Sequence, residues 1–406
     1  MYFDKNIKKN LFLNVNINFF NNFTLPLRSL AKLFMIVSLF CLVIASFFTS
    51  FYTIPILVKI ANRFHIYDTP SLIKIHKRPT TFLGGVAIII SFLVPISLFL
   101  PDIIKKPSYI NAYTIILTII FLHGLCDDFF NYKAIRKLII QLLLSGLLIF
   151  KTKFYLPIDN LFGLVTIPAY ISIIITIICT SAIVNAYNLI DGADGLAGSI
   201  SLIASLFYGI LFYFDGNYFF SAMAITLSGG LIAFIFYNKP PAYIFMGDSG
   251  SLFIGMILAT FTFVFIEQQN GLLQFNLSNR IILSFSFLSI PILDMIRLFL
   301  YRIYFKTSPF KGDNNHIHHL MAKIGLTSKQ TLLIIVTYQL LNIGVSFLAL
   351  DKSWIGFVLV NLCMYIFIIQ FLRQLKTFLN NLEKKRVKDI YTTPESEPKL
   401  IVYKNS

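Results

Sequence analysis

The chain has 406 residues, of which 57% are apolar and 13% are charged. Soluble globular domains are about one quarter charged, so this chain cannot cover its surface with polar groups and must be solvated by lipid. Its net charge of +16 is not arranged as a basic stripe interleaved with aromatic residues, which argues against nucleic acid as a partner. The four cysteines have neither metal-ligand nor redox spacing.

The apolar residues gather in long runs, each near the length of a spanning helix, rather than in the short alternating segments of a membrane barrel. The sequence therefore predicts an all-α polytopic membrane bundle with about 10 to 11 transmembrane helices. The expected spans are 34–57, 82–100, 109–125, 137–150, 165–187, 197–214, 218–237, 250–267, 281–301, 331–350 and 353–372. Residues 34–372 form the transmembrane domain in this interpretation, and 1–33 form an N-terminal extension. The charged tail, 373–406, is expected to be a surface helix followed by a disordered end.

The basic residues between the spans are distributed unevenly. The odd-numbered loops and the tail hold most of the lysines and arginines. The even-numbered loops hold only Lys105, Lys106, Lys151, Lys153, Arg280 and Lys352. The positive-inside rule therefore places the odd-numbered loops and the C-terminus in the cytoplasm, for a multi-pass protein of the plasma or inner membrane. The basic residues of 1–33 run against this orientation, and one hypothesis is that translation begins at Met35.

Acids, histidines and glycines gather in the odd-numbered loops, which predicts a single site on one side of the membrane. Asp127 and Asp128 end one of the spans. They either cap the next helix or bind a cation and move a proton, because carboxylates at a membrane boundary are otherwise costly. Lys133 and Lys137 share a helix face just beyond this pair. They either bring positive charge to a phosphate or reach toward lipid headgroups.

A second acidic stretch lies in the segment NAYNLIDGADGLAG, where Asn188, Asp191 and Asp194 step by three residues. The glycines of this segment allow the backbone to approach a ligand closely. Asp248 lies in FMGDSGS, at the start of another span. Each motif alone could be an ordinary turn, but both lie on the same side of the membrane. Oxygen ligands of this kind suit Mg²⁺, with Mn²⁺ as the alternative, rather than zinc.

Three histidines, His316, His318 and His319, lie in one loop. No cysteine is near and the spacing matches no zinc signature, so phosphate binding is preferred, with proton placement as a further option. In the first loop, Lys74 lies among further basic residues. That loop either faces lipid headgroups or holds a nucleotide or lipid phosphate.

The ordered set of DD, NAYNLIDGADGLAG, FMGDSGS and HIHH resembles the prenyl-phosphate N-acetylhexosamine-1-phosphate transferases, over about residues 55–345. Members of this family move a sugar phosphate from a UDP-sugar to polyprenyl phosphate and release UMP. The HIHH form is similar to the branch that joins GlcNAc-1-phosphate to undecaprenyl phosphate for O-antigen, enterobacterial common antigen or teichoic acid linkage units. The muropeptide branch has an unbroken triple histidine, which Ile317 interrupts here.

The resemblance implies that 34–372 is a catalytic domain, with its active site in a cytoplasmic groove, and it gives each motif a role. Asn188 and Asp248 correspond to the ligands of Mg²⁺, or of Mn²⁺ as the alternative. Catalytic roles near the reacting phosphates fall to Asp127, Asp128 and Asp191. Substrate binding falls to Lys74, Asp194, His316, His318 and His319. Lys133 and Lys137 are expected to bind substrate because of their helix face beside the acid pair.

The resemblance also implies the partners, namely a UDP-sugar donor, a polyprenyl phosphate acceptor and membrane lipids, and it allows a homodimer. Direct attack of the acceptor phosphate on the β-phosphorus of the donor is the preferred mechanism, with a covalent aspartyl intermediate as the alternative. Another UDP-sugar or UDP-MurNAc-pentapeptide is an alternative donor. A secondary transporter is the alternative of another class, but it predicts acids near the bilayer midplane and two matching halves.

Overall fold

The computed structural model describes residues 25–68, 79–100, 107–157, 168–268, 271–308 and 315–392. Within these ranges the regular elements are helices, with no β-strand, which confirms the expected all-α class. Each expected span coincides with one helix or, in one case, with a pair. In chain order the helices are α2 (Leu25–Phe64), α3 (Gly84–Phe99), α4 (Ile110–Phe130), α5 (Ala134–Thr152), α6 (Ala169–Ile190), α7 (Leu196–Phe214), α8 (Tyr218–Asn238), α9 (Gly247–Glu267), α10 (Leu277–Phe287), α11 (Ser289–Tyr304), α12 (Ile317–Lys323), α13 (Ser328–Leu348) and α14 (Trp354–Thr392).

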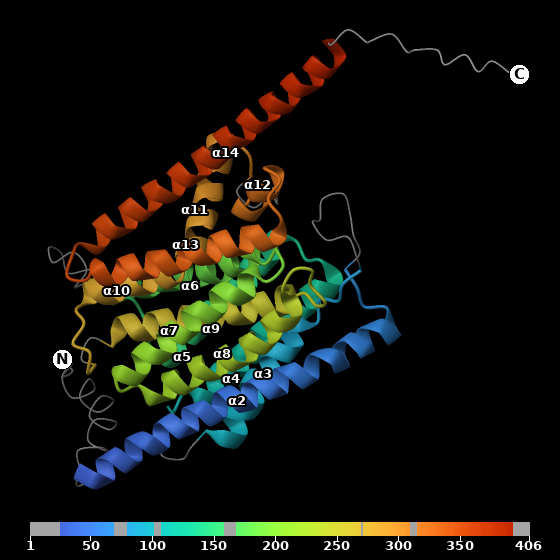
Figure 1. Ribbon diagram of the computed structural model, residues 1–406. Coiled ribbons are helices and arrows are strands. Elements are labelled where there is room, and N and C mark those ends of the chain that lie inside the picture. The colour runs from blue at the N-terminus through green and yellow to red at the C-terminus, as the bar shows by residue number, and fades with distance from the viewer. Residues whose placement is uncertain are drawn as a thin grey trace, which may run out of the picture.

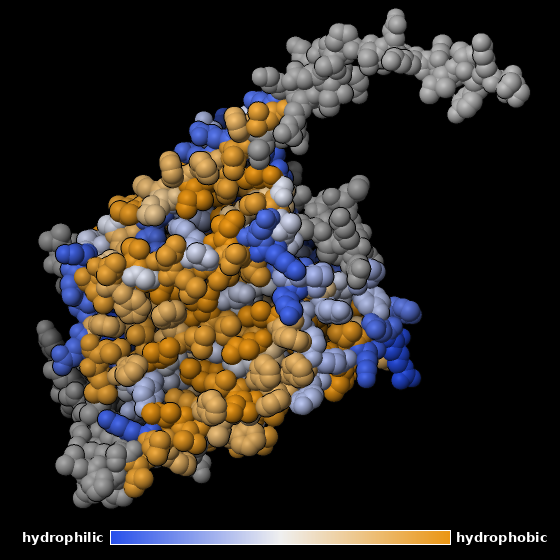
Figure 2. Space-filling view, in the orientation of Figure 1, coloured by the Kyte–Doolittle hydropathy of each residue, from blue (hydrophilic) through white to orange (hydrophobic). Residues whose placement is uncertain are grey.

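The bundle has the helix lengths and the surface of a membrane protein. Eight of the described helices are long and apolar enough to cross a membrane, or nine if the bent pair α10–α11 counts as one span. Helices α3 and α5, which coincide with expected spans, are not among these eight. Helix α3 has only 16 residues, and α5 carries Arg136, Lys137 and Lys151 near its ends. In Figure 2 apolar side chains cover most of the visible face, and hydrophilic side chains form smaller patches at its two sides and near its middle. This distribution is the one expected for a bundle whose sides face lipid.

Helix α9 lies at the centre of the bundle, with α3, α4, α6, α7 and α10 packed around it (Figure 1). Its apolar stretch is 100% buried inside the protein, as expected for a helix that is apolar all round. Helix α4 approaches the start of α9 at Gly124, where a Cβ atom would lie 2.5 Å from the carbonyl oxygen of Asp248. Glycine is required at this position, and the close approach brings the end of α4 to the start of α9.

The span expected at 281–301 is two helices, α10 and α11, which meet at an angle of 78°. Helix α11 carries Pro291 in its first turn, and proline has no N–H to donate to the carbonyl four residues earlier. Gln339 of α13 fills the gap, because its side-chain N–H donates to the carbonyls of Ser286 at 2.7 Å and Phe287 at 2.9 Å. The hydropathy pattern records only an apolar run and therefore predicts one straight span, which is wrong in this detail.

The C-terminal helix does not stop at the expected boundary after residue 372. Helix α14 is continuous from Trp354 to Thr392 and projects beyond the bundle in Figure 1. The surface helix expected for the tail is therefore an extension of the last span. The expected disordered end, 393–406, lies outside the described residues, as does 1–24 of the N-terminal extension. Helix α2 begins inside that extension, at Leu25.

Candidate active site

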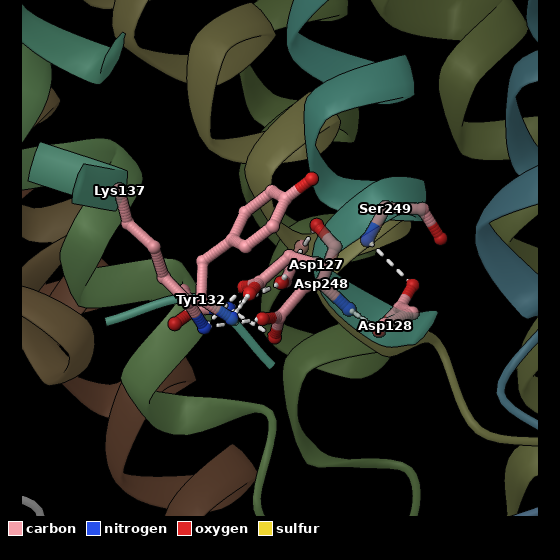
Figure 3. Close-up of polar contacts among 8 residues, drawn as sticks. Asp127, Asp128, Tyr132, Lys137, Asp248 and Ser249 are labelled. Atoms are coloured by element: carbon pink, nitrogen blue, oxygen red, sulfur yellow. Dashed lines mark hydrogen bonds and ion pairs between the residues drawn. The ribbon is translucent and has the colours of Figure 1, made fainter. Parts of the chain in front are cut away.

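The sequence motifs meet at one end of the bundle. Asp127 lies in the last turn of α4, and Lys137 lies in the first turn of α5. Asn188 lies in the last turn of α6, and Asp248 lies in the first turn of α9. Figure 3 shows the Lys137 side chain reaching from α5 toward the acids. Four helix ends therefore place these side chains together, as the sorting of polar motifs among the loops predicts.

Lys137 lies between two carboxylates. Its Nζ is 2.6 Å from Asp248 Oδ2 and also forms an ion pair with Asp127 Oδ2. The Asp127 side chain is fully buried, whereas those of Asp248 and Lys137 are 28% and 23% exposed. The other oxygen of Asp127, Oδ1, accepts the N–H of Tyr132 at 2.6 Å. Asp127 is thus engaged in holding Lys137 and the α4–α5 turn, while Asp248 keeps access to a ligand.

Asn188 and Asp248, the two residues expected to bind Mg²⁺, are in contact. The side-chain amide of Asn188 donates to Asp248 Oδ1 at 2.6 Å and to Ser251 Oγ at 3.1 Å. A flipped amide would present its oxygen beside the Asp248 carboxylate, and two such oxygens suit an ion that takes its remaining ligands from phosphate and water. In the described part of the chain, no group of three or more His, Cys, Asp or Glu is arranged to hold a metal ion. An ion held by Asn188 and Asp248 would therefore need its other ligands from outside this pair.

Asp128 has a different environment from its neighbour Asp127. Its Oδ1 accepts the N–H of Asp248 at 2.7 Å, and its Oδ2 accepts the N–H of Ser249 at 3.0 Å (Figure 3). A carboxylate in this position satisfies free N–H groups at a helix N-terminus and is favoured by the helix dipole. Asp128 therefore caps α9 rather than the next helix, α5. The contact fixes the backbone that carries Asp248.

The loop between α6 and α7 carries Asp191 and Asp194. Asp191 is partly buried just beyond α6. Burial, followed by the negative charges of Asp248, Asp128 and Asp194, raises the pKa of the Asp191 carboxyl well above its usual range. Asp194 Oδ2 accepts the N–H of Ala242 at 3.1 Å. Asp194 therefore connects this loop to the α8–α9 loop. Asp191 is close enough to the other acids to be affected by their negative charges.

The three histidines lie at the start of α12. The rings of His316 and His318 stack with centroids 5.7 Å apart, and those of His318 and His319 are 4.4 Å apart. His318 is 2% exposed, and a Cβ atom at Gly192 would lie 2.6 Å from its Nε2. His318 therefore packs against the loop that carries Asp191. Burial, followed by the charges of the other two histidines, lowers the pKa of His318 to about 3, so its ring is neutral at neutral pH.

The remaining predicted residues border this site. Lys133 is the exposed N-cap residue of α5, and Lys74 lies outside the described residues. The stretch PTTFLGG, residues 79–85, contacts the backbone at the start of α9. The N–H groups of Gly84 and Gly85 donate to the carbonyls of Phe245 at 2.9 Å and Met246 at 2.8 Å. This segment therefore supports the backbone just before Asp248.

Two buried residues around His316 are absent from the residues predicted above. Asp294 of α11 lies 2.9 Å from His316 Nδ1 through its Oδ2, and Tyr365 of α14 donates its hydroxyl to Asp294 Oδ1 at 3.0 Å. The acid within the apolar run PILDMIR is a signal that could have pointed to Asp294, because an intramembrane acid is costly unless it has a function. Tyr365 gives no such signal, since it is one aromatic residue within a long apolar span.

Comparison with known proteins agrees with this arrangement. The family model described as glycosyl transferase family 4 matches residues 110–266, a stretch that contains the acid pair, Asn188 and Asp248. The undecaprenyl-phosphate alpha-N-acetylglucosaminyl 1-phosphate transferase of Thermotoga maritima is 30% identical over 317 residues, which cover 77% of this chain and 91% of the relative. The decaprenyl-phosphate N-acetylglucosaminephosphotransferase of Mycobacterium leprae is 29% identical over 332 residues, covering 76% and 81%.

A more distant relative shows similar coverage. The undecaprenyl-phosphate alpha-N-acetylglucosaminyl 1-phosphate transferase of Salmonella typhi is 24% identical over 352 residues, which cover 81% of this chain and 92% of the relative. The similarity therefore extends over most of both chains and is not confined to the motifs. With its helical bundle, its clustered motifs and these matches, the chain belongs to glycosyl transferase family 4.

Proposed function

We propose that the protein transfers N-acetylglucosamine-1-phosphate from UDP-GlcNAc to undecaprenyl phosphate, or to a related polyprenyl phosphate, and releases UMP. This reaction would be the first membrane step in the synthesis of a cell-envelope polysaccharide. The names of the relatives support the sugar and the lipid acceptor. The observation that carries the proposal is Lys137, held between Asp127 and Asp248 at one end of an apolar bundle. That arrangement offers a fixed cation beside a partly exposed carboxylate, where a lipid phosphate can reach the cation.

The chemistry requires two anions to approach each other. Lys137 supplies a fixed positive charge, and preorganised charge of this kind stabilises phosphoryl transfer more than water can. Mg²⁺ held by Asn188 and Asp248 would add positive charge at the phosphates. An oxygen of the acceptor phosphate forms a bond to the sugar-bearing phosphorus of the donor. The bond from that phosphorus to the bridging oxygen breaks, and the electron pair leaves with UMP.

The other side chains of the site bind and orient the substrates in this proposal. Asp127 fixes the ammonium of Lys137, and Asp128 fixes the start of α9. Asp191 would help to hold the nucleotide and its phosphates beside the acid cluster. The histidines of α12 contact the pyrophosphate. Because reacting groups must be held close and aligned, most of the rate enhancement comes from this positioning.

The side of the membrane is part of the proposal. The loops that carry the site are also those richest in lysine and arginine, so the positive-inside rule supports a cytoplasmic active site in the plasma or inner membrane. One of the basic residues counted against this orientation is not a free loop charge. Arg280 is 0% exposed and forms an ion pair with Asp215 at 2.7 Å. The opposite end of the bundle therefore has fewer unpaired basic charges than its sequence suggests.

The test is transfer of labelled GlcNAc-phosphate from UDP-GlcNAc to undecaprenyl phosphate by the purified full chain, with and without Mg²⁺. We expect a lipid product and UMP in equal amounts, both dependent on the metal and both lost in Asp248→Asn. Asp351→Asn is the matched control, because Asp351 accepts the side-chain N–H of Asn279 at 2.9 Å near the start of α10, at the opposite end of the bundle. Failure to transfer from any UDP-sugar would contradict the proposed reaction.

A further inference from the structure

Asp294 is a buried acid with four polar contacts. It is 2% exposed, and its Oδ1 accepts Arg297 Nη2–H at 2.8 Å, Arg297 Nε–H at 3.2 Å and the Tyr365 hydroxyl at 3.0 Å. Its Oδ2 lies 2.9 Å from His316 Nδ1. Arg297 Nη2 also donates to the carbonyl of Asn315 at 2.5 Å. The carboxylate therefore joins α11, the segment just before α12, and α14.

These contacts determine which nitrogen of His316 carries a proton. A carboxylate that is ion-paired with Arg297 and accepts the Tyr365 hydroxyl can only accept hydrogen bonds. His316 Nδ1 must therefore donate to Asp294, which fixes the orientation of the ring. Any further partner of the ring must be met by Nε2. Carboxylates act on functional histidines in this way in other proteins.

The same contacts connect the C-terminal helix to the site. Tyr365 is 1% exposed, and a buried tyrosine hydroxyl needs a hydrogen-bond partner, which here is Asp294. His316 stacks on His318 with ring centroids 5.7 Å apart, and His318 packs against Gly192. A continuous series of contacts therefore runs from α14 through Asp294 and the histidines to the loop that carries Asp191.

We propose that Asp294 is a positioning residue that orients His316 through its Nδ1–H, so that Nε2–H of the doubly protonated ring donates to the substrate pyrophosphate, and that Tyr365 of α14 holds Asp294 in place. The inference rests on the proposed function, because it assigns the histidine to the phosphates of that reaction. It gives the last helix a part in catalysis without contact with substrate. Neither residue touches the acid cluster around Lys137 in the described structure.

The test is a double-mutant cycle with Asp294→Asn, His316→Gln and the double variant, measured as kcat and KM in the transfer reaction. Asp294→Asn is expected to lower kcat by about tenfold or more, as loss of a carboxylate behind a functional histidine does. If Asp294 acts through His316, the double variant is no slower than His316→Gln alone. If the two losses multiply, as they do for independent sites, the inference is overturned.

Tyr365→Phe keeps the test independent of folding, because it removes one hydroxyl and leaves the ion pair of Asp294 with Arg297. We expect loss of this one hydrogen bond to lower kcat by about threefold to fivefold. In the His316→Gln background the same substitution should leave kcat unchanged. Tyr208→Phe is the matched control, since Tyr208 is equally buried and bonds Thr262 at 2.8 Å in the core. A Tyr365→Phe enzyme with the wild-type kcat would contradict the proposed role of α14.

Failure of this inference can be separated from failure of the proposed function. Wild-type transfer is measured first, so a wrong reaction shows as an inactive wild type. In that case the same cycle is read by the binding of inorganic pyrophosphate to the full chain. The inference is supported if Asp294→Asn weakens pyrophosphate binding in the wild-type background but has no effect on binding in the His316→Gln background. Equal binding by all four proteins overturns it.

Discussion

Lys137 is the residue on which the charge balance of the site depends. Its ammonium contacts both Asp127 and Asp248, so Lys137→Met should lower kcat by about 100-fold through loss of a fixed cation near the phosphates. It should also lower the free energy of unfolding by about 3 kcal/mol, because Asp127 would remain buried without its partner. Lys151→Met, at the exposed far end of α5, is the control. If Lys137→Met had the activity of the wild type, a role for Lys137 in the reaction would be excluded.

Gly192 matters because of the ring that packs against it. An alanine there would place a Cβ atom 2.6 Å from His318 Nε2 and 3.0 Å from Cε1, so the ring must move. A displacement of about 1 Å at a positioned group lowers rates by up to about 100-fold, and we expect Gly192→Ala to lose at least tenfold in kcat. Gly146→Ala is the control, because the nearest atom to its Cβ is 3.7 Å away. The transfer assay at saturating substrates distinguishes the two variants, and equal rates would argue against contact between Gly192 and His318.

His318 should make stability depend on pH. Its pKa falls from the usual value of 6.5 to about 3 in the folded protein, so between these values the unfolded chain binds more protons than the folded one. Stability is therefore fully present above pH 6.5 and is lost as the pH falls toward 3. At pH 5 the loss is about 2 kcal/mol, and His318→Asn should abolish it. Thermal unfolding at pH 7 and pH 5 measures this, and equal pH shifts in wild type and variant would contradict it.

At the scale of elements, the start of α9 is set by a residue from another helix. Asp128 of α4 accepts the N–H groups of Asp248 and Ser249, so Asp128→Ala should lower the free energy of unfolding by about 1 to 2 kcal/mol, as loss of a cap does. Because the backbone of Asp248 is then no longer fixed, the kcat of Asp128→Ala should also fall. The kcat of Asp128→Asn should fall less, because asparagine keeps one acceptor oxygen. Chemical denaturation and the transfer assay test both parts. If Asp128→Asn were as inactive as Asp248→Asn, a direct catalytic role would be favoured over capping.

The elements also show how far sequence reasoning reaches. The helices and the gathering of the polar motifs at one end could be predicted, because apolar runs of spanning length and the sorting of polar motifs into alternate loops are local features of the chain. The pairing of Asn188 with Asp248 came only from the family resemblance. The break between α10 and α11 could not be predicted, since it depends on Gln339 donating to Ser286 and Phe287 from α13. The partner of Asp294 likewise comes from a distant helix, at Tyr365. Contacts between side chains far apart in sequence have no periodic signature.

At the scale of the whole molecule, the orientation of the bundle in the membrane decides on which side the active site lies. All helix ends that carry site residues lie at one end of the bundle, so fixing one loop relative to the membrane fixes the active site. Lys239 follows α8 and lies at the site end, whereas Lys352 lies between α13 and α14 at the other end. Both are exposed. The positive-inside rule predicts that Lys239 faces the cytoplasm and Lys352 the outside.

This orientation can be measured with single cysteines. In a background where the four native cysteines are replaced by alanine, Lys352→Cys should react with a membrane-impermeant maleimide in intact cells. Lys239→Cys should react only after the membrane is permeabilised, and both variants should keep transfer activity. The reverse pattern would place the acid cluster outside the cell, where no cytoplasmic pool of UDP-sugar reaches it, so the same result would also overturn the proposed donor. Labelling of both in intact cells would contradict a bundle whose two ends are separated by lipid.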